Sequence, residues 1–268
     1  TEGNWLCNGL IRDWASWQKE SGTSFTSLCA VLDVLSPDTA EKLAPGELTR
    51  ISLDDARDMP TIRTPYGNDV AVMHASSGMR RVIALAYFLV WCWEEHKKAA
   101  KLLSEQTTNQ VVFLIDEVES HLHPKWQRRI IPALLSAGAE DQLLAVTHSP
   151  LVMASVEPRF DETMDAWFDI DLVASQSEQQ PAVELKKRPF VRLGDVSRWL
   201  MSEAFNLGSA RSLESELVLQ EAAEILSEQE IDHAKARALD VRLRSLLGDT
   251  DPFWIRWRYV GEKQGWLQ

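Results

Sequence analysis

Two adjacent carboxylates stand at the end of an apolar run in the middle of the sequence. The run from Val111 to Ile115 holds five apolar residues, as in a strand that is covered on both faces, and Asp116 and Glu117 follow it directly. Open α/β sheets bind ligands at the carboxyl ends of their strands. Asp116 could therefore hold Mg²⁺ through its water shell, and Glu117 could polarise the water that displaces a γ-phosphate. The simpler alternative is that both acids cap the next helix.

A histidine and a serine-rich loop could act beside these acids. His148 follows a second apolar run, so its imidazole could donate a hydrogen bond to a γ-phosphate oxygen, or make only a local hydrogen bond. Ser76, Ser77 and Gly78 precede a long apolar stretch with helical spacing. They could offer backbone N–H groups, a hydroxyl and a helix dipole to an anion, although alone such a loop more simply caps its helix.

The elements that position these residues alternate between helix and strand. A helix is expected from Met79 to Trp93, a strand from Val111 to Ile115, a helix from Pro124 to Ser136 and a second buried strand from Gln142 to Val146. Strand, helix and strand in this order imply a parallel sheet with a right-handed crossover. The expected fold class is therefore α/β.

The sequence divides into three expected parts. Residues 1–65 are interpreted as helical and connecting structure, residues 66–158 as the lobe with the motifs, and residues 159–268 as strands with a helical extension. The last part is expected to contain paired strands at 167–173 and 182–185, helices at 196–205, 212–227 and 230–247, and an aromatic, basic tail at 251–266. The two amphipathic helices either complete the domain or dock a partner protein.

Three runs of residues, in this order, resemble the ABC-class AAA ATPases related to SMC and OLD proteins (AAA_15 or AAA_21 type). They are His74 to Arg81, Phe113 to Pro124 and Ala145 to Pro150. The Asp-Glu-x-Glu-x-x-Leu-His-Pro run in the second resembles in particular bacterial ATPases of anti-phage defence, such as those of retron and Septu systems. The resemblance is close from about Tyr66 to Pro158. It implies a parallel-sheet P-loop NTPase fold, of which this chain holds the C-terminal portion of an ABC-type head.

The resemblance assigns a role to each motif. It implies a signature loop formed by Ser76, Ser77 and Gly78, a Walker B pair formed by Asp116 and Glu117, a D-loop region at 120–123, and a switch histidine, His148. Met79 stands where many relatives carry a polar residue, so the signature is atypical there. The implied cofactors are ATP and Mg²⁺, and the implied activity is ATP hydrolysis.

The phosphate-binding loop of such ATPases does not occur in this sequence. No Gly-x-x-x-x-Gly-Lys-Ser/Thr is present, and the Gly-Glu-Lys at Gly261 lies too near the end to replace it. Either the loop lies upstream on the same polypeptide, or the chain is a degenerate subunit that supplies only a signature loop. Because the sequence begins with Thr1 rather than Met and keeps Glu117, we expect the loop upstream, in a longer or processed polypeptide.

In the resembling family two heads enclose ATP, and the signature of one closes on the P-loop of the other. This implies a homodimer around Mg-ATP that controls an effector, such as a nuclease or toxin, in anti-phage defence. Two alternatives stay open. One is a non-enzymatic assembly subunit that uses nucleotide only as a dimer clamp. The other is an SMC-like DNA-repair ATPase, for which this sequence shows no extended heptads after the signature loop.

Composition limits the remaining possibilities. The 268-residue chain is 45% hydrophobic, has no apolar stretch long enough for a bilayer, and holds three widely spaced cysteines, so a cytoplasmic protein with no membrane segment is expected. Its net charge of −12 leaves any nucleic-acid binding to local basic clusters. Asp169 and Asp171 are interpreted as an exposed strand face rather than nuclease metal ligands, and His121 and His123 as loop residues rather than zinc ligands.

Overall fold

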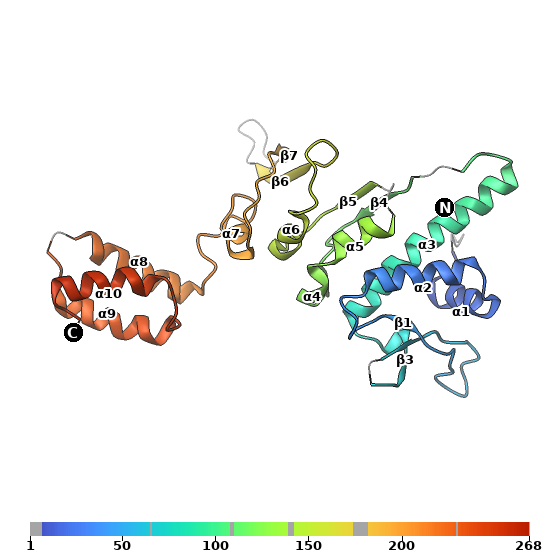
Figure 1. Ribbon diagram of the computed structural model, residues 1–268, viewed down its shortest axis with the longest axis horizontal. Coiled ribbons are helices and arrows are strands. Elements are labelled where there is room, and N and C mark those ends of the chain that lie inside the picture. Colours follow the sequence, from blue (N-terminus) through green and yellow to red (C-terminus); the bar gives the residue numbers. More distant parts are fainter. Residues whose placement is uncertain are drawn as a thin grey trace. The chain divides into compact units, whose positions relative to one another are not determined.

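The chain is built of helices and short strands (Figure 1). The computed structural model describes residues 7–64, 66–107, 110–138, 142–173, 182–228 and 230–267. They belong to two compact units, Thr1–Trp199 and Leu200–Gln268. The division of the sequence at residues 65 and 158 stays a prediction.

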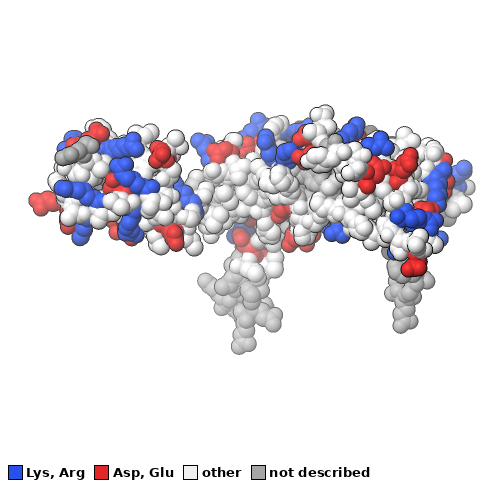
Figure 2. Space-filling model, turned by 90° about the horizontal axis from the view of Figure 1, so that it is seen from below, with Lys and Arg blue, Asp and Glu red and all other residues white. Residues whose placement is uncertain are grey.

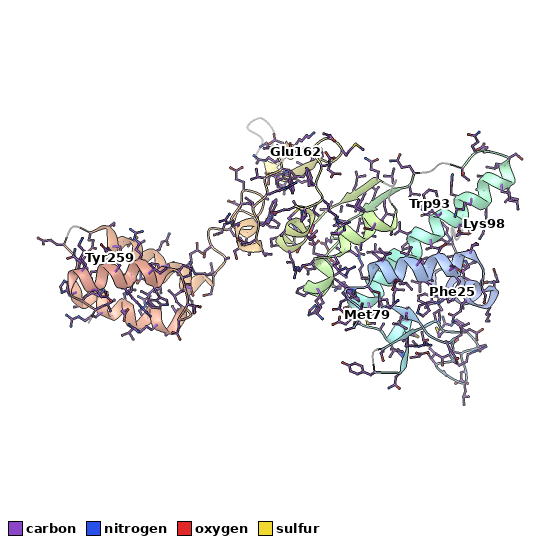
Figure 3. All side chains as sticks on the ribbon, in the orientation of Figure 1. Phe25, Met79, Trp93, Lys98, Glu162 and Tyr259 are labelled. Carbon is purple, nitrogen blue, oxygen red and sulfur yellow. The ribbon has the colours of Figure 1, made fainter. Side chains whose placement is uncertain are left out.

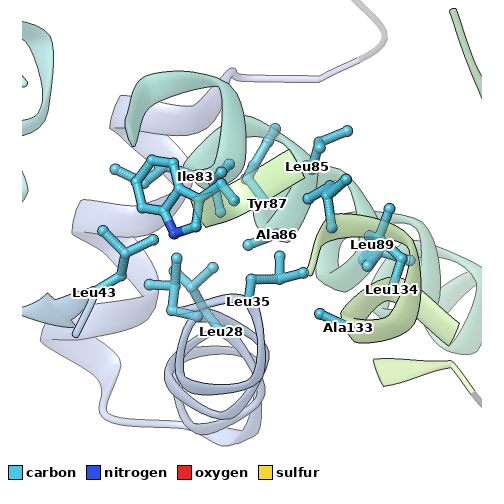
Figure 4. Close-up of a cluster of buried hydrophobic side chains, with 14 of the residues drawn as sticks. Leu28, Leu35, Leu43, Ile83, Leu85, Ala86, Tyr87, Leu89, Ala133 and Leu134 are labelled. Atoms are coloured by element: carbon cyan, nitrogen blue, oxygen red, sulfur yellow. The ribbon is translucent and has the colours of Figure 1, made fainter. Parts of the chain in front are cut away.

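Helix α3 (Ser77–Leu103) is the centre of the N-terminal unit, and it continues ten residues beyond the expected end at Trp93. It packs against α2 (Thr23–Leu35) and, over a smaller area, against α1 (Leu10–Glu20), and it shares its core with α5 (Ile130–Ala137). The buried side chains of α3 recur at helical spacing, and Figure 4 shows them facing α2 and α5. The core between these helices includes Ile83, Ala86 and Leu89 of α3, Leu28 and Leu35 of α2, and Ala133 and Leu134 of α5. This core fixes the direction of α3 and hence the place of its N-terminus.

A buried hydrogen bond joins the first helix to the third. The Tyr87 hydroxyl donates to Asp13 Oδ2 at 2.7 Å, and Asn8 Nδ2 donates to the other oxygen of Asp13 at 3.1 Å. Burial and the Asp13 carboxylate raise the pKa of Tyr87, so the phenol stays a donor. The contact gives the buried carboxylate the partners that it needs.

A small antiparallel sheet precedes α3. Its strands β1 (Ala44–Pro45), β2 (Thr61–Arg63) and β3 (Asp69–Ala71) pair in that order, and the 3₁₀-helix η1 (Val72–His74) leads from β3 into α3. This arrangement delivers Ser76 to the start of the long helix.

The two strands that were expected to carry the motifs form a parallel pair. β4 (Val112–Ile115) and β5 (Gln142–Ala145) lie side by side, with Ile115 opposite Ala145. The expectations that the first strand is covered on both faces and that the second strand is buried are both wrong for the described residues. Phe113 and Leu143 pack on the core, whereas Val112, Leu114 and Leu144 are 55%, 73% and 46% exposed. Alternate residues point to opposite faces, and only one face meets the helices.

The helix expected from Pro124 to Ser136 is divided into two. α4 (Pro124–Gln127) ends before Arg128, and α5 begins at Ile130. Pro132 explains the break, because proline has no N–H to donate and its ring clashes with the carbonyl four residues before it. In α5 Pro132 lies in the first turn, where helices tolerate it.

After α6 (Pro150–Val156) an antiparallel hairpin forms from β6 (Trp167–Val173) and β7 (Ala182–Arg188), as expected. Asp171 is exposed, but the Asp169 carboxylate is largely covered and pairs with Arg188 Nε at 2.7 Å, so the expected exposed strand face is only partly correct. Helix α7 (Val196–Leu200) is shorter than the helix expected at 196–205. The chain between this hairpin and α7 is held by a buried acid, Glu157.

Glu157 collects three donors from α7 and the segment before it. It accepts hydrogen bonds from the backbone N–H of Leu193 (2.7 Å) and Gly194 (3.0 Å) and from the indole of Trp199 (2.6 Å). Burial opposes ionisation of this carboxyl, but these donors and the charge of Arg192 hold its pKa below the ordinary value. Glu157 is therefore a structural anion within this unit.

The described residues of the C-terminal unit form the helices α8 (Leu213–Ser227), α9 (His233–Leu246) and α10 (Phe253–Gln264). The expected aromatic tail is thus a helix, and its Trp254 and Trp257 pack with Val218 and Leu243 in the core of this unit. Trp257 donates to the buried Asp240 at 2.9 Å. Among the described residues of the chain, no helix has the length and apolar character needed to cross a bilayer.

Candidate active site

The acid pair lies directly beyond β4, at a turn that leads back to β5. Val146 N donates to Ile115 O at 2.9 Å, and Val118 N donates to Val146 O at 3.1 Å, so the ladder continues past both strands. Between these contacts Glu117 has a φ of 47°, in the left-handed region that costs most residues energy. This turn leaves the side chains of Asp116 and Glu117 exposed at the carboxyl end of the sheet.

Two side chains hold this strained turn. Arg81 of α3 donates through Nη2 to the backbone oxygens of Asp116 (2.9 Å) and Glu117 (3.5 Å). The Ser120 hydroxyl donates to Glu117 Oε2 at 2.7 Å. A hydrogen bond to a carboxylate fixes its orientation, so Glu117 is directed rather than free to rotate.

His148 lies at the end of the neighbouring strand, and its backbone N–H contacts the loop of residues 116–123 between β4 and α4, called the acid-pair loop here. Glu119 Oε1 accepts a hydrogen bond from His148 N at 2.7 Å, and Glu119 Oε2 accepts one from Thr147 Oγ1 at 2.5 Å. The imidazole itself is exposed. In a second contact, the Ser149 hydroxyl donates a hydrogen bond to Gln127 Oε1 of α4 at 2.8 Å. The two strand-end loops are therefore joined by side chains that lie between them.

The serine loop forms the N-terminus of α3, as its sequence predicts. Ser76 is the N-cap, and its hydroxyl accepts a hydrogen bond from Met79 N at 3.2 Å. Ser76 and Ser77 are exposed, and Met79 packs against the core at the start of α3 (Figure 3). The first amides of a helix have no partner within it, so this end can accept an anion.

Gly78 brings the serine loop against the acid-pair loop. A Cβ on Gly78 would lie 2.7 Å from the backbone oxygen of His121, which is closer than real Cβ atoms come to other atoms. His121 has a φ of 64°, and His123 caps α4 by accepting from Lys125 N at 3.2 Å. The loops expected to carry the signature, the acid pair and the switch histidine are thus linked by direct contacts, through His121 and Glu119, although the roles of these residues stay predictions.

Glu119, Arg81 and Gln127 are the site residues that sequence reasoning did not single out. The acidic residue two places after the acid pair was visible in the motif, and Arg81 was visible only as one of several basic residues. Their function depends on which backbone groups they reach. Only the fold supplies that information.

The carboxylates of this site suit an Mg²⁺ ion that is bound together with a nucleotide. Residues 7–267, with the gaps named above, contain no group of three or more His, Cys, Asp or Glu side chains that could hold a metal ion alone. Mg²⁺ at nucleotide sites takes one or two carboxylates, with phosphates and waters completing the octahedron. The exposed carboxylate of Asp116 fits this partial role, with Glu117 beside it.

The model of the family described as "AAA domain, putative AbiEii toxin, Type IV TA system" matches residues 4–154. The chain belongs to this AAA family. Its membership covers every motif residue named above and confirms the expected P-loop NTPase fold class. The resemblance to proteins of retron and Septu systems is also confirmed by the relatives that follow.

Three curated proteins are similar to the chain. "Retron Vc95 probable ATPase" of Vibrio cholerae serotype O1 biovar El Tor is 31% identical over 111 residues, 40% of this chain and 20% of that protein. "Retron Ec83 probable ATPase" of Escherichia coli is 26% identical over 203 residues, 74% of this chain and 33% of that protein. "Septu protein PtuA" of Bacillus mycoides (strain KBAB4) is 31% identical over 96 residues, 36% of this chain and 12% of that protein.

The chain spans a third or less of the length of these relatives. Among solved structures, one described as "Structural biochemistry of ATP-driven dimerization and DNA stimulated activation of SMC ATPases" is 12% identical and has a TM-score of 0.41. The similarity covers 65% of this chain and 88% of that chain.

Proposed function

We propose that this chain is the signature and Walker B part of an ATP-hydrolysing head that belongs to a longer cytoplasmic polypeptide. The head dimerises around Mg-ATP and controls an effector, such as a nuclease or toxin, in bacterial anti-phage defence. The names of the retron and Septu relatives support the defence role. The observation that carries the ATPase assignment is the contact of Glu119 with the His148 N–H, which joins the loop after the acid pair to the histidine at the neighbouring strand end.

Each residue has a separate task in this proposal. Bound Mg²⁺ would supply charge neutralisation at the phosphates, and Asp116 would hold it through its water shell. Glu117, directed by Ser120, would take a proton from the attacking water. His148 would donate a hydrogen bond from its exposed imidazole to a γ-phosphate oxygen.

The exposed apolar face of β4 and β5 supports a further layer that carries the P-loop. Parallel strands are normally covered on both faces. Leu114 is 73% exposed, and Val146 just beyond β5 is 40% exposed. Both lie close to the acid pair and His148 in sequence, so a lobe that covers this face would also reach the site. We expect that lobe on the same polypeptide, and a partner subunit is the alternative.

The exposed serines support a composite site. Ser76 and Ser77 face solvent at the N-terminus of α3, whereas Gly78 is buried against the acid-pair loop. The serine loop can therefore reach a nucleotide on a second copy without breaking its own contacts. Nucleotide binding then stabilises a dimer with near two-fold symmetry.

Nucleic acid is not required by this proposal. Figure 2 shows Lys and Arg side chains mixed with Asp and Glu over the face in view. Exposed aromatic residues such as Tyr259, 66% exposed and labelled in Figure 3, lie among basic residues of α10. Neighbouring basic and aromatic side chains can bind single-stranded nucleic acid, but in a chain with a net charge of −12 they do not by themselves indicate DNA or RNA binding.

The test uses the full-length polypeptide, after its mass and upstream sequence have been determined. We expect Glu117→Gln to lower ATP turnover by at least about a hundredfold, because the base that activates water is lost. Glu162→Gln is the matched control, since Glu162 is exposed and remote in sequence from the motifs (Figure 3). Equal turnover in all three proteins would contradict the proposal and favour the non-enzymatic assembly subunit.

A further inference from the structure

Glu119 uses both oxygens of its carboxylate on the loop that carries the histidine. One oxygen accepts the His148 N–H at 2.7 Å, and the other accepts the Thr147 hydroxyl at 2.5 Å. Thr147 Oγ1 in turn accepts a hydrogen bond from Ser149 N at 3.0 Å. The three consecutive residues from Thr147 to Ser149 are thus arranged around one side chain that comes from the other strand.

This arrangement restricts the backbone from which the imidazole projects. The ladder between β4 and β5 ends with Val118 N and Val146 O, so Thr147 and His148 lie beyond its last bond. Without Glu119, the His148 N–H would have no ladder partner at that point. Charge-assisted hydrogen bonds are shorter and stronger than neutral ones, so the carboxylate replaces the missing rung of the ladder.

The same contacts surround the charge of Glu119 with hydrogen-bond donors. A carboxylate near phosphates is unfavourable unless donors occupy it. Both oxygens of Glu119 already accept hydrogen bonds within the protein. Glu119 therefore differs from Asp116 and Glu117, whose side chains are exposed beyond the strand.

We propose that Glu119 is a positioning residue that sets the direction of His148 relative to the acid pair. This inference rests on the proposed ATPase function, because it concerns the histidine of that site. Glu119 acts through the His148 backbone and touches neither nucleotide nor metal. Loss of its carboxylate releases the loop from Thr147 to Ser149 and leaves the imidazole misdirected, while the rest of the nucleotide contacts remain.

The test is a double-mutant cycle in the full-length protein. We expect Glu119→Ala to lower kcat by about ten- to a hundredfold, as loss of residues that orient site ligands typically does, with KM for ATP within about twofold. In a His148→Ala background the same change should have almost no further effect, because Glu119 acts through His148. Glu119→Gln keeps an acceptor for the His148 N–H and a donor for Thr147, so it should recover most of kcat.

A second readout does not depend on turnover. Hydrogen exchange of peptides that contain His148 should be faster in Glu119→Ala and close to that of the parent in Glu119→Gln. An equal loss of kcat from Glu119→Ala in both the parent and the His148→Ala backgrounds would overturn the positioning role and indicate a merely structural residue. Unchanged exchange at His148 would also overturn it. Absence of turnover in the parent would overturn the ATPase proposal itself, so the two failures are distinguishable.

Discussion

The contact between Gly78 and the acid-pair loop makes a prediction about stability. Gly78 has no unusual backbone angle, and in most helices glycine to alanine is stabilising by about 1 kcal/mol. Here the new Cβ would stand 2.7 Å from His121 O, whereas ordinary van der Waals contact begins at 3.4 Å. The atom it meets is backbone, and the left-handed φ of His121 limits how that backbone can move.

The expected result is therefore opposite in sign to the usual one. Overpacking costs about 1–3 kcal/mol, which outweighs the gain in helix propensity. We expect Gly78→Ala to lower the free energy of unfolding of the N-terminal unit by about 1 kcal/mol. Ser77→Ala is the matched control, because Ser77 is exposed in the same turn, and it should change stability by no more than about 0.5 kcal/mol.

The assay is denaturant unfolding, with hydrogen exchange of residues 117–123 to locate the change. In Gly78→Ala these amides should exchange faster, since the loop must move away from α3. A Gly78→Ala protein as stable as Ser77→Ala, or more stable, would refute the close approach of the two loops.

Three further predictions concern other parts of the chain. Glu157→Ala should lower the free energy of unfolding by about 1–3 kcal/mol at neutral pH. Because the pKa of Glu157 is lowered in the folded protein, the stability that its carboxylate contributes is fully present above pH 4.5 and is lost as the pH falls below that value, and unfolding at several pH values will show this loss. Asp240→Ala should destabilise the C-terminal unit by about 1–3 kcal/mol in thermal or denaturant unfolding, because it removes the buried acceptor of the Trp257 indole. The control Glu221→Ala removes only an exposed ion pair and should destabilise this unit by less than about 1 kcal/mol, so equal losses from the two changes would contradict the prediction. Leu114→Asn should hardly change the stability of this chain but should destabilise the full-length protein, in which we expect its face to be covered; the same small effect in both would argue against that layer.

The sequence predicts the elements of the site well because their patterns are local. An apolar run that ends in acids, and a serine before an apolar helical stretch, each need only neighbouring residues to be recognised. The structure accordingly has Asp116 directly after β4 and Ser76 as the N-cap of α3. Pro132 is also a local signal for the break between α4 and α5, although we expected one continuous helix from Pro124 to Ser136.

The connections between the elements could not be predicted in this way. Whether Glu119 points to solvent or to His148 depends on the register of β4 and β5 and on the turn at Glu117. The burial of β4 depends on which element packs against its second face, and the apolar run from Val111 to Ile115 cannot specify that element. The tail became α10 because its tryptophans recur at helical spacing, a signal that its composition concealed.

The composite site is the central claim, and mixing two inactive full-length variants tests it most directly. Ser77→Arg blocks the signature but keeps the acid pair, and Glu117→Gln does the reverse. If each site takes its acid pair from one protomer and its signature from the partner, mixed dimers contain one intact site. An equimolar mixture should then recover about a quarter of the parent ATPase activity, since about half of the dimers are mixed and each has one of two sites intact. Activity no greater than that of the separate variants, although mixed dimers form, would contradict the account.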